Sequence, residues 1–165
     1  VRDLTEKGID LKDKEIIILG AGGSARSIIP SLLRQDPSRI TIGNRTHSRA
    51  EALAYQFSSP ANPINVIDMS QDLNFLPDLI INSTSVGLRN EPSLISTDQM
   101  DKNSIVYDIV YTPMNTDLIN NAKKNGATII YGYEMLLSQA SRAFEIWHGV
   151  KAPYDNMKKA IFGGM

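Results

Sequence analysis

The sequence contains no cysteine, which excludes disulfide bonds, thiol catalysis and cysteine-ligated metal sites. This absence fits a reducing compartment, and we expect a cytoplasmic protein. The chain also lacks an excess of either charge: 17 Lys and Arg residues stand against 18 Asp and Glu residues, for a net charge of −1. This balance argues against nucleic acid or an anionic membrane as the main partner.

Long apolar runs are missing as well. No stretch approaches the roughly 18–20 residues of a membrane span, and the N-terminus does not resemble a signal peptide. Histidine is rare, and neither His47 nor His148 has a second ligand at metal-binding spacing. We therefore expect no membrane segment and no metal site.

Strand-like and helix-like segments alternate along the chain, whose length suits one compact domain. The predicted strands are 15–19, 39–43, 64–67, 78–82, 104–109 and 128–131. Several are continuous apolar runs, such as Leu79-Ile80-Ile81, which is typical of parallel strands covered on both faces. We predict an α/β fold: a Rossmann-like, doubly wound, parallel sheet of six strands in the order 3-2-1-4-5-6, with helices on both faces.

Helical spacing of apolar residues marks the connections between the strands. One helix is predicted to begin after Thr116 as N-cap and to end before Gly126. Residues 133–148 give the strongest amphipathic pattern, and a last short helix covers about 154–162. Pro30 falls inside the first crossover helix, where its missing N–H predicts a bend. The apolar stripe of 133–148 consists of Met135, Leu136, Ala140, Ala143, Phe144 and Trp147.

A glycine-rich segment follows the first predicted strand. The apolar run 16–19 leads into Gly-Ala-Gly-Gly-Ser-Ala at 20–25, and a helical pattern comes next. This is the strand–turn–helix context that the G-x-G-x-x-G/A fingerprint of dinucleotide-binding sheets requires. Gly20 allows the tight turn, Gly22 lets the backbone approach a pyrophosphate, and the helix N-terminus forms an anion site. The segment indicates a dinucleotide cofactor.

The residues after the second strand distinguish between NAD and NADP. In NAD-binding sheets, an Asp or Glu at that strand end accepts hydrogen bonds from the adenosine ribose. Here the strand 39–43 is followed by Asn-Arg-Thr-His-Ser-Arg at 44–49, with no acid before Glu51. A carboxylate would repel a 2′-phosphate, whereas Arg45 and Arg49 would bind it. A solvated basic turn is the competing interpretation, and the position beside the glycine-rich turn favours NADP.

Other strand ends supply further candidates, because ligands of open parallel sheets bind beyond the carboxyl ends of the strands. The fourth strand runs into the small, polar segment 82–87. This segment suits a ribose or nicotinamide lying against the backbone, and a plain turn is the competing interpretation. Asp108 ends the fifth strand, where an acid more often accepts hydrogen bonds from loop amides than performs catalysis. Gln139 lies on the apolar stripe of 133–148, so its amide needs partners. We predict that Gln139 borders a polar cleft rather than the sheet core.

Together these motifs resemble the NADP-binding half of the shikimate dehydrogenase family. The matching segments are 1–4 with 8–9, 20–25, 44–46 with Arg49, 82–87, 107–113, and 132–149 with its Met135-Leu136, Gln139, Phe144, Trp147 and Gly149. The sequence departs from the family at three places: Ile109 stands where methionine is frequent, Ser24 where alanine is, and Pro30 interrupts a helix.

The resemblance implies the following site residues. The cofactor-binding residues would be Gly20, Ala21, Gly22, Gly23 and Ser24 at the pyrophosphate, Asn44, Arg45, Thr46 and Arg49 at the adenosine phosphate, and Thr84, Ile109 and Gly132 toward the nicotinamide. Tyr111 and Gln139 would reach the substrate.

The resemblance also implies an activity, the NADPH-dependent reduction of 3-dehydroshikimate to shikimate in aromatic amino-acid biosynthesis. The family's catalytic lysine and aspartate belong to an N-terminal domain. We therefore expect residues 1–165 to be the NADP-binding domain of a two-domain enzyme, with no catalytic residue of its own. Such a chain would bind the cofactor without turnover.

Three alternatives stay open from the sequence alone. A quinate/shikimate dehydrogenase of broader specificity would share these motifs, although Arg45 and Arg49 favour NADP over NAD. A glutamyl-tRNA reductase shares an Asn-Arg-Thr after its second strand, but the segment 132–139 counts against it. A stand-alone NADP-binding module is the third, and the pairing of Tyr111 with Gln139 speaks against it. The sequence leaves open whether the chain forms a homodimer.

Overall fold

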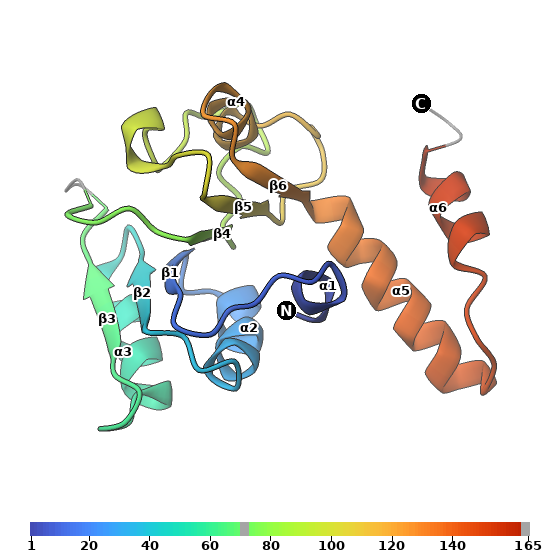
Figure 1. Ribbon diagram of the computed structural model, residues 1–165, viewed down its shortest axis with the longest axis horizontal. Coiled ribbons are helices and arrows are strands. Elements are labelled where there is room, and N and C mark those ends of the chain that lie inside the picture. Colours follow the sequence, from blue (N-terminus) through green and yellow to red (C-terminus); the bar gives the residue numbers. More distant parts are fainter. Residues whose placement is uncertain (70–72, 163–165) are drawn as a thin grey trace.

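Six parallel strands form one sheet in the computed structural model of this chain, which describes residues 1–69 and 73–162 (Figure 1). The strand order β3-β2-β1-β4-β5-β6 confirms the prediction of a doubly wound sheet. The elements are α1 (Arg2–Glu6), β1 (Glu15–Leu19), α2 (Gly23–Leu33), β2 (Arg39–Gly43), α3 (His47–Phe57), β3 (Ile64–Ile67), β4 (Leu79–Asn82), the 3₁₀ turn η1 (Thr97–Gln99), β5 (Ile105–Asp108), α4 (Asp117–Lys124), β6 (Thr128–Tyr131), α5 (Gly132–His148) and α6 (Tyr154–Phe162).

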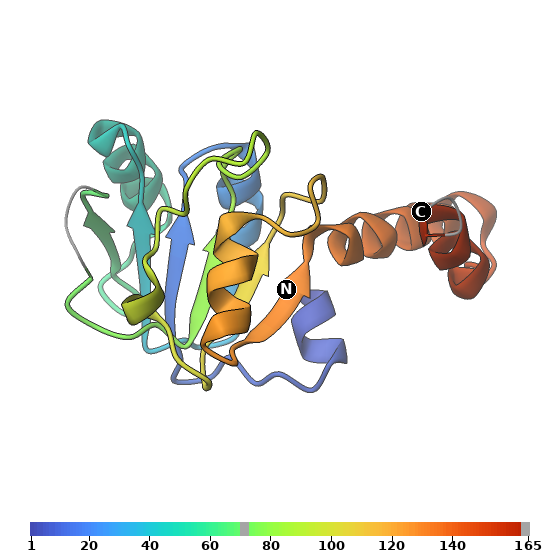
Figure 2. The ribbon, with the colours of Figure 1, turned by 90° about the horizontal axis from the view of Figure 1, so that it is seen from above.

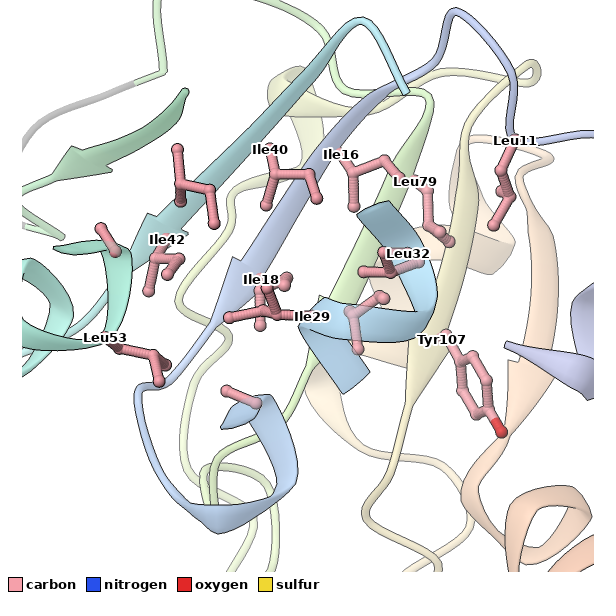
Figure 3. Packing of buried hydrophobic residues seen from close by; sticks show 14 of the residues in the cluster. Leu11, Ile16, Ile18, Ile29, Leu32, Ile40, Ile42, Leu53, Leu79 and Tyr107 are labelled. Atoms are coloured by element: carbon pink, nitrogen blue, oxygen red, sulfur yellow. The ribbon is translucent and has the colours of Figure 1, made fainter. Parts of the chain in front are cut away.

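The sheet is buried on both faces, as the apolar strands require. Ile16 and Ile18 of β1 point into a core cluster that includes Ile29 of α2 and Leu53 of α3 (Figure 3). Ile17, which points to the other face of the sheet, belongs to a second core cluster. Residues of α4 and residues on either side of η1 cover this cluster. Each fully buried isoleucine contributes about 1.5–3 kcal/mol relative to an exposed one. This two-sided burial explains the continuous apolar runs in the sequence.

Element boundaries agree closely with the sequence prediction. Thr116 caps α4, since its Oγ1 accepts a hydrogen bond from the Ile119 N–H at 3.2 Å. Gly126 follows the helix with φ of +68°, a left-handed conformation that suits glycine. The helix α2 continues through Pro30 to Leu33 as one α-helix. Two short elements, α1 and η1, carry no strong sequence pattern and were not predicted.

Much of the apolar stripe of α5 lies outside the sheet core. Helix α5 leaves the edge of the sheet and runs beside α1 and α6 (Figures 1 and 2), so the sheet does not cover its apolar face. Leu137 is buried, but the side chain of Leu136 is 41% exposed and that of Trp147 is 79% exposed. Gln139 is exposed rather than part of a buried stripe. Despite this apolar surface, no helix within the described ranges is long and apolar enough to cross a membrane.

Candidate functional site

The glycine-rich turn brings three strand ends together. Gly20 has φ of +105°, and its N–H donates to the Gly43 carbonyl at 2.7 Å. A Cβ on Gly20 would lie 2.8 Å from the Ser83 Oγ and 2.9 Å from the Thr84 Cγ2. Only glycine therefore fits at this position, both for its backbone angle and for the space available. The turn that follows β1 is packed directly against the ends of β2 and β4.

The start of α2 leaves an open anion site. Gly22 is the N-cap, and a Cβ added at Gly22 or Gly23 would meet nothing within 4 Å. In the described structure no side chain caps this helix start and its first turn holds no acidic residue. The first backbone N–H groups of α2 are thus available to an anion such as a pyrophosphate. Ala25 is fully buried, so the helix packs closely on the sheet behind this opening.

The basic loop lies beside this turn, because Gly43 pairs with Leu19 in the sheet register. The Asn44 Nδ2 donates to the Thr46 carbonyl at 2.8 Å, which holds the loop in shape before Thr46 as N-cap of α3. Arg45 and Arg49 are exposed, and neither forms an ion pair with any residue that the structure describes. Two guanidinium groups that lack carboxylate partners suit a phosphate ligand.

A buried hydrogen-bond network shapes the ends of β4 and β5. Asn82 and Asp108 are neighbours in the register, and the Asn82 Nδ2 donates to the Asp108 Oδ1 at 2.9 Å and to the Val86 carbonyl at 3.0 Å. The Asn82 Oδ1 accepts from the Thr84 hydroxyl at 2.6 Å. The predicted cofactor residue Thr84 is therefore held in place by Asn82.

Asp108 is completely buried and its carboxylate is satisfied inside the protein. Besides Asn82, the Val110 N–H donates to its Oδ1 at 3.0 Å and the Thr116 hydroxyl donates to its Oδ2 at 2.5 Å. Burial raises the pKa of Asp108, while the hydrogen bonds from Thr116, Val110 and Asn82 act in the opposite direction. These contacts agree with the structural role expected for Asp108.

The predicted nicotinamide residues Ile109 and Gly132 lie in contact. A Cβ on Gly132 would fall 2.4 Å from the Ile109 carbonyl oxygen, so the start of α5 packs directly on the backbone after β5. The predicted substrate residue Tyr111 is 56% exposed in the same loop. Gln139 lies seven residues into α5, about 10 Å along the helix from Gly132. No hydrogen bond joins Tyr111 and Gln139 in the described part of the chain.

Sequence reasoning missed two parts of this site. Asn82 was predicted only as part of a polar segment and Thr116 only as a helix cap, yet both bind Asp108. A signal was present, because Asn82 and Asp108 are polar residues that end adjacent apolar strands of the predicted sheet. A further missed contact joins the Tyr107 hydroxyl to the Asp3 carboxylate at 2.7 Å and connects α1 to β5.

A family model described as shikimate / quinate 5-dehydrogenase matches residues 3–117, well over half of the chain. The chain belongs to this family. A second model, described as the C-terminal domain of shikimate 5′-dehydrogenase, matches residues 132–162, which hold α5 and α6. Membership of the shikimate / quinate dehydrogenase family sets aside the glutamyl-tRNA reductase alternative.

Family relatives are longer than this chain. A shikimate dehydrogenase (NADP(+)) from Nitrosopumilus maritimus is 46% identical over 164 residues, which cover 98% of this chain and 60% of the relative. One from Vibrio atlanticus is 42% identical over 152 residues, or 92% of this chain and 54% of the relative. The chain therefore spans 54–60% of the length of these two family members.

Solved structures of family members share the fold. A shikimate dehydrogenase in complex with NADP⁺ superposes with a TM-score of 0.87 at 35% identity, over 99% of this chain and 58% of that one. The Thermus thermophilus enzyme, in complex with NADP(H) and shikimate, gives 0.83 at 28% identity over 99% and 60%. The Listeria monocytogenes enzyme, in complex with shikimate and NAD, gives 0.87 at 29% over 97% and 60%.

Proposed function

We propose that this chain binds NADP(H) at the carboxyl edge of its sheet and forms the cofactor half of a shikimate dehydrogenase, which reduces 3-dehydroshikimate to shikimate. The observation that carries the proposal is the arginine loop: Arg45 and Arg49 are exposed beside the Gly20 turn, where an NAD-binding sheet has an acid. Two of the related structures, in complex with NADP⁺ and with NADP(H), support the same cofactor, whereas the Listeria monocytogenes enzyme holds NAD.

The described residues fit this cofactor. The uncapped start of α2 and the open space before Gly22 and Gly23 suit the pyrophosphate. Arg45 and Arg49 would hold the 2′-phosphate, with Asn44 and Thr46 shaping the loop around it. Ala21 and Ser24 would lie at the pyrophosphate with these glycines, and the residues that would face the nicotinamide side are Thr84, Ile109 and Gly132. When bound, NADPH supplies the hydride for carbonyl reduction.

The chain's own residues would bind and orient rather than transfer protons. Tyr111 and Gln139 are exposed hydrogen-bonding groups that would contact the substrate. Asp108 is unsuited to proton transfer, because it is fully buried and accepts three hydrogen bonds. We assign no catalytic acid or base to this chain, and we propose that residues 1–165 bind cofactor without measurable turnover.

A paired experiment on one sample tests the proposal. Calorimetric titration with NADPH is expected to give saturable binding, and shikimate-dependent reduction of NADP⁺ is expected to be undetectable, since general acid–base assistance alone is worth about 10²–10⁴-fold. Absence of NADPH binding by the folded chain would overturn the cofactor assignment. Clear turnover would overturn the second part and direct attention to Tyr111 and Asp108 as catalytic groups.

A broader quinate/shikimate specificity is the second candidate function, because the matching family description names both substrates. The two specificities can be distinguished with a longer protein that contains this chain and has the length of the relatives. Its turnover rates with shikimate and with quinate would be compared. The cytoplasmic location and any homodimer stay predictions.

A further inference from the structure

A continuous series of contacts links three loops of the candidate site, which follow β1, β4 and β5. The Thr84 methyl group lies against Gly20 in the glycine-rich turn: a Cβ atom added to Gly20 would be only 2.9 Å from the Thr84 Cγ2. The Thr84 hydroxyl donates to the Asn82 Oδ1 and accepts from the Val86 N–H at 3.0 Å. Asn82 in turn donates to Asp108. The glycine turn and the 82–87 loop are thus connected to the end of β5.

Asp108 is the point where these segments meet. Its three donors come from β4, from the backbone after β5 and from the cap of α4. The Val110 bond fixes the backbone that also carries the Ile109 carbonyl, on which Gly132 packs. A single buried carboxylate is thus connected, through Asn82 and Val110, to Thr84, Ile109 and the start of α5.

We propose that Asp108 is a positioning residue for the nicotinamide half of the cofactor site. It acts through Asn82 and Val110, which set where Thr84 and Ile109 lie, and it does not touch the ligand itself. Arg45 and Arg49, which form the adenosine half after β2, make no hydrogen bond to Asp108, Asn82 or Thr84 in the described structure. The inference rests on the proposed binding of NADP(H).

Asp108→Asn is the informative variant because it changes the charge and not the size. An amide can keep one oxygen toward Asn82 and Val110, but its NH₂ group then faces the Thr116 hydroxyl, which must turn to accept. Hydrogen bonds to a neutral oxygen are weaker than those to a carboxylate, so Asn82 and Val110 are held less firmly. We therefore expect the Asp108→Asn variant to fold, with the 82–87 loop and the backbone at Val110 less firmly held.

Two ligands separate a positioning role from a general loss of structure. NADPH would contact both halves of the site, whereas adenosine 2′,5′-bisphosphate would contact the arginine loop and, through its 5′-phosphate, the start of α2, but has no nicotinamide half to reach Thr84 and Ile109. Asp108→Asn in the 165-residue chain should weaken NADPH binding about fivefold or more, and leave binding of the bisphosphate within about twofold. Asn82→Ala, which removes the bridge from the other side, should give the same pattern.

Asp78→Asn is the matched control. Asp78 also binds neighbouring groups, through the Glu15 N–H at 2.9 Å and the Lys14 Nζ at 3.0 Å, but at the opposite end of the sheet. This variant should bind both ligands like the parent chain.

Each outcome decides between the explanations. The positioning role would be overturned if folded Asp108→Asn bound NADPH as tightly as the parent chain. It would also be overturned if Asp108→Asn and Asn82→Ala each lost affinity equally for NADPH and for the bisphosphate. Failure of the parent chain to bind either ligand would instead overturn the proposed function. If Asp108→Asn does not fold, Asn82→Ala decides alone.

Discussion

At the scale of single residues, the site depends on two exposed arginines that have no carboxylate partner in the described structure. A charge-assisted hydrogen bond to phosphate is worth about 1.5–3 kcal/mol. Arg45→Ala should therefore weaken NADPH binding about tenfold or more, and leave NADH binding nearly unchanged, as measured by calorimetry. Arg34→Ala, at the exposed end of α2, is the control. Equal losses for the two cofactors would contradict the 2′-phosphate assignment.

Tyr107 gives a prediction for alkaline pH. Its burial, and next the hydrogen bond to Asp3, raise the pKa of Tyr107 above its ordinary value of 10.0. Below about pH 10 the phenol is protonated in both states and the bond contributes fully. Above that pH the unfolded chain loses this proton while the folded chain keeps it, so the free energy of unfolding falls as the pH rises.

Tyr107→Phe should therefore lose about 1–2 kcal/mol of stability at pH 7, where Asp3 loses its donor. The difference from the parent chain should shrink above pH 10, because phenylalanine has no proton to lose. Urea denaturation between pH 7 and 11 measures this, with Tyr55→Phe as the control, since Tyr55 is 90% exposed. A difference that stays constant across this range would show that Tyr107 is not linked to folding in this way.

The roles of residues at the strand ends were predictable from the sequence only where the motif consists of residues close together in the chain. The Gly20 turn and the Arg45 loop depend on neighbours within a few positions, and the structure places them as expected. The bridge from Asn82 to Asp108 joins residues 26 positions apart. Such a bond requires the strand register, which no local pattern contains.

At the scale of elements, α5 shows what a hydrophobic pattern does and does not determine. The stripe correctly predicted a long helix, because apolar spacing at 3–4 residues reports the period of the backbone. It did not identify the surface against which the stripe packs. Helix α5 leaves the sheet after Gly132, so Trp147 is exposed while Leu137 is buried.

Two substitutions on α5 should show that the burial of a side chain, and not its place in the apolar stripe, determines its contribution to the free energy of unfolding. Leu137→Ala removes a side chain that is only 1% exposed and should cost about 2–5 kcal/mol of unfolding free energy. Gln139→Ala, two positions on, should change it by less than about 0.5 kcal/mol, because this side chain is exposed. Chemical denaturation followed by circular dichroism measures both. A large loss for Gln139→Ala would show that its amide is a satisfied core group.

At the scale of the whole molecule, ligand binding and folding are coupled through the sheet. The four loops of the site follow β1, β2, β4 and β5, so a ligand held there favours the folded state of the entire domain. NADPH at 100 times its dissociation constant should add about 2.7 kcal/mol and raise the melting temperature by about 5–10 °C. NADH at the same concentration should raise it less. Equal shifts would show that the arginine loop does not discriminate between them.

The central place of β1 has a consequence for synthesis on the ribosome. One edge of β1 pairs with β2, within 24 residues of chain, but its other edge pairs with β4, as Leu19 does with Asn82. Until residues 79–82 have been made, the Ile16-Ile17-Ile18 run therefore has an unpaired edge. An apolar strand with an open edge is a template for pairing with other chains. The nascent chain thus exposes the open edge of this apolar strand between the synthesis of β1 and that of β4, and the arrival of β4 covers it.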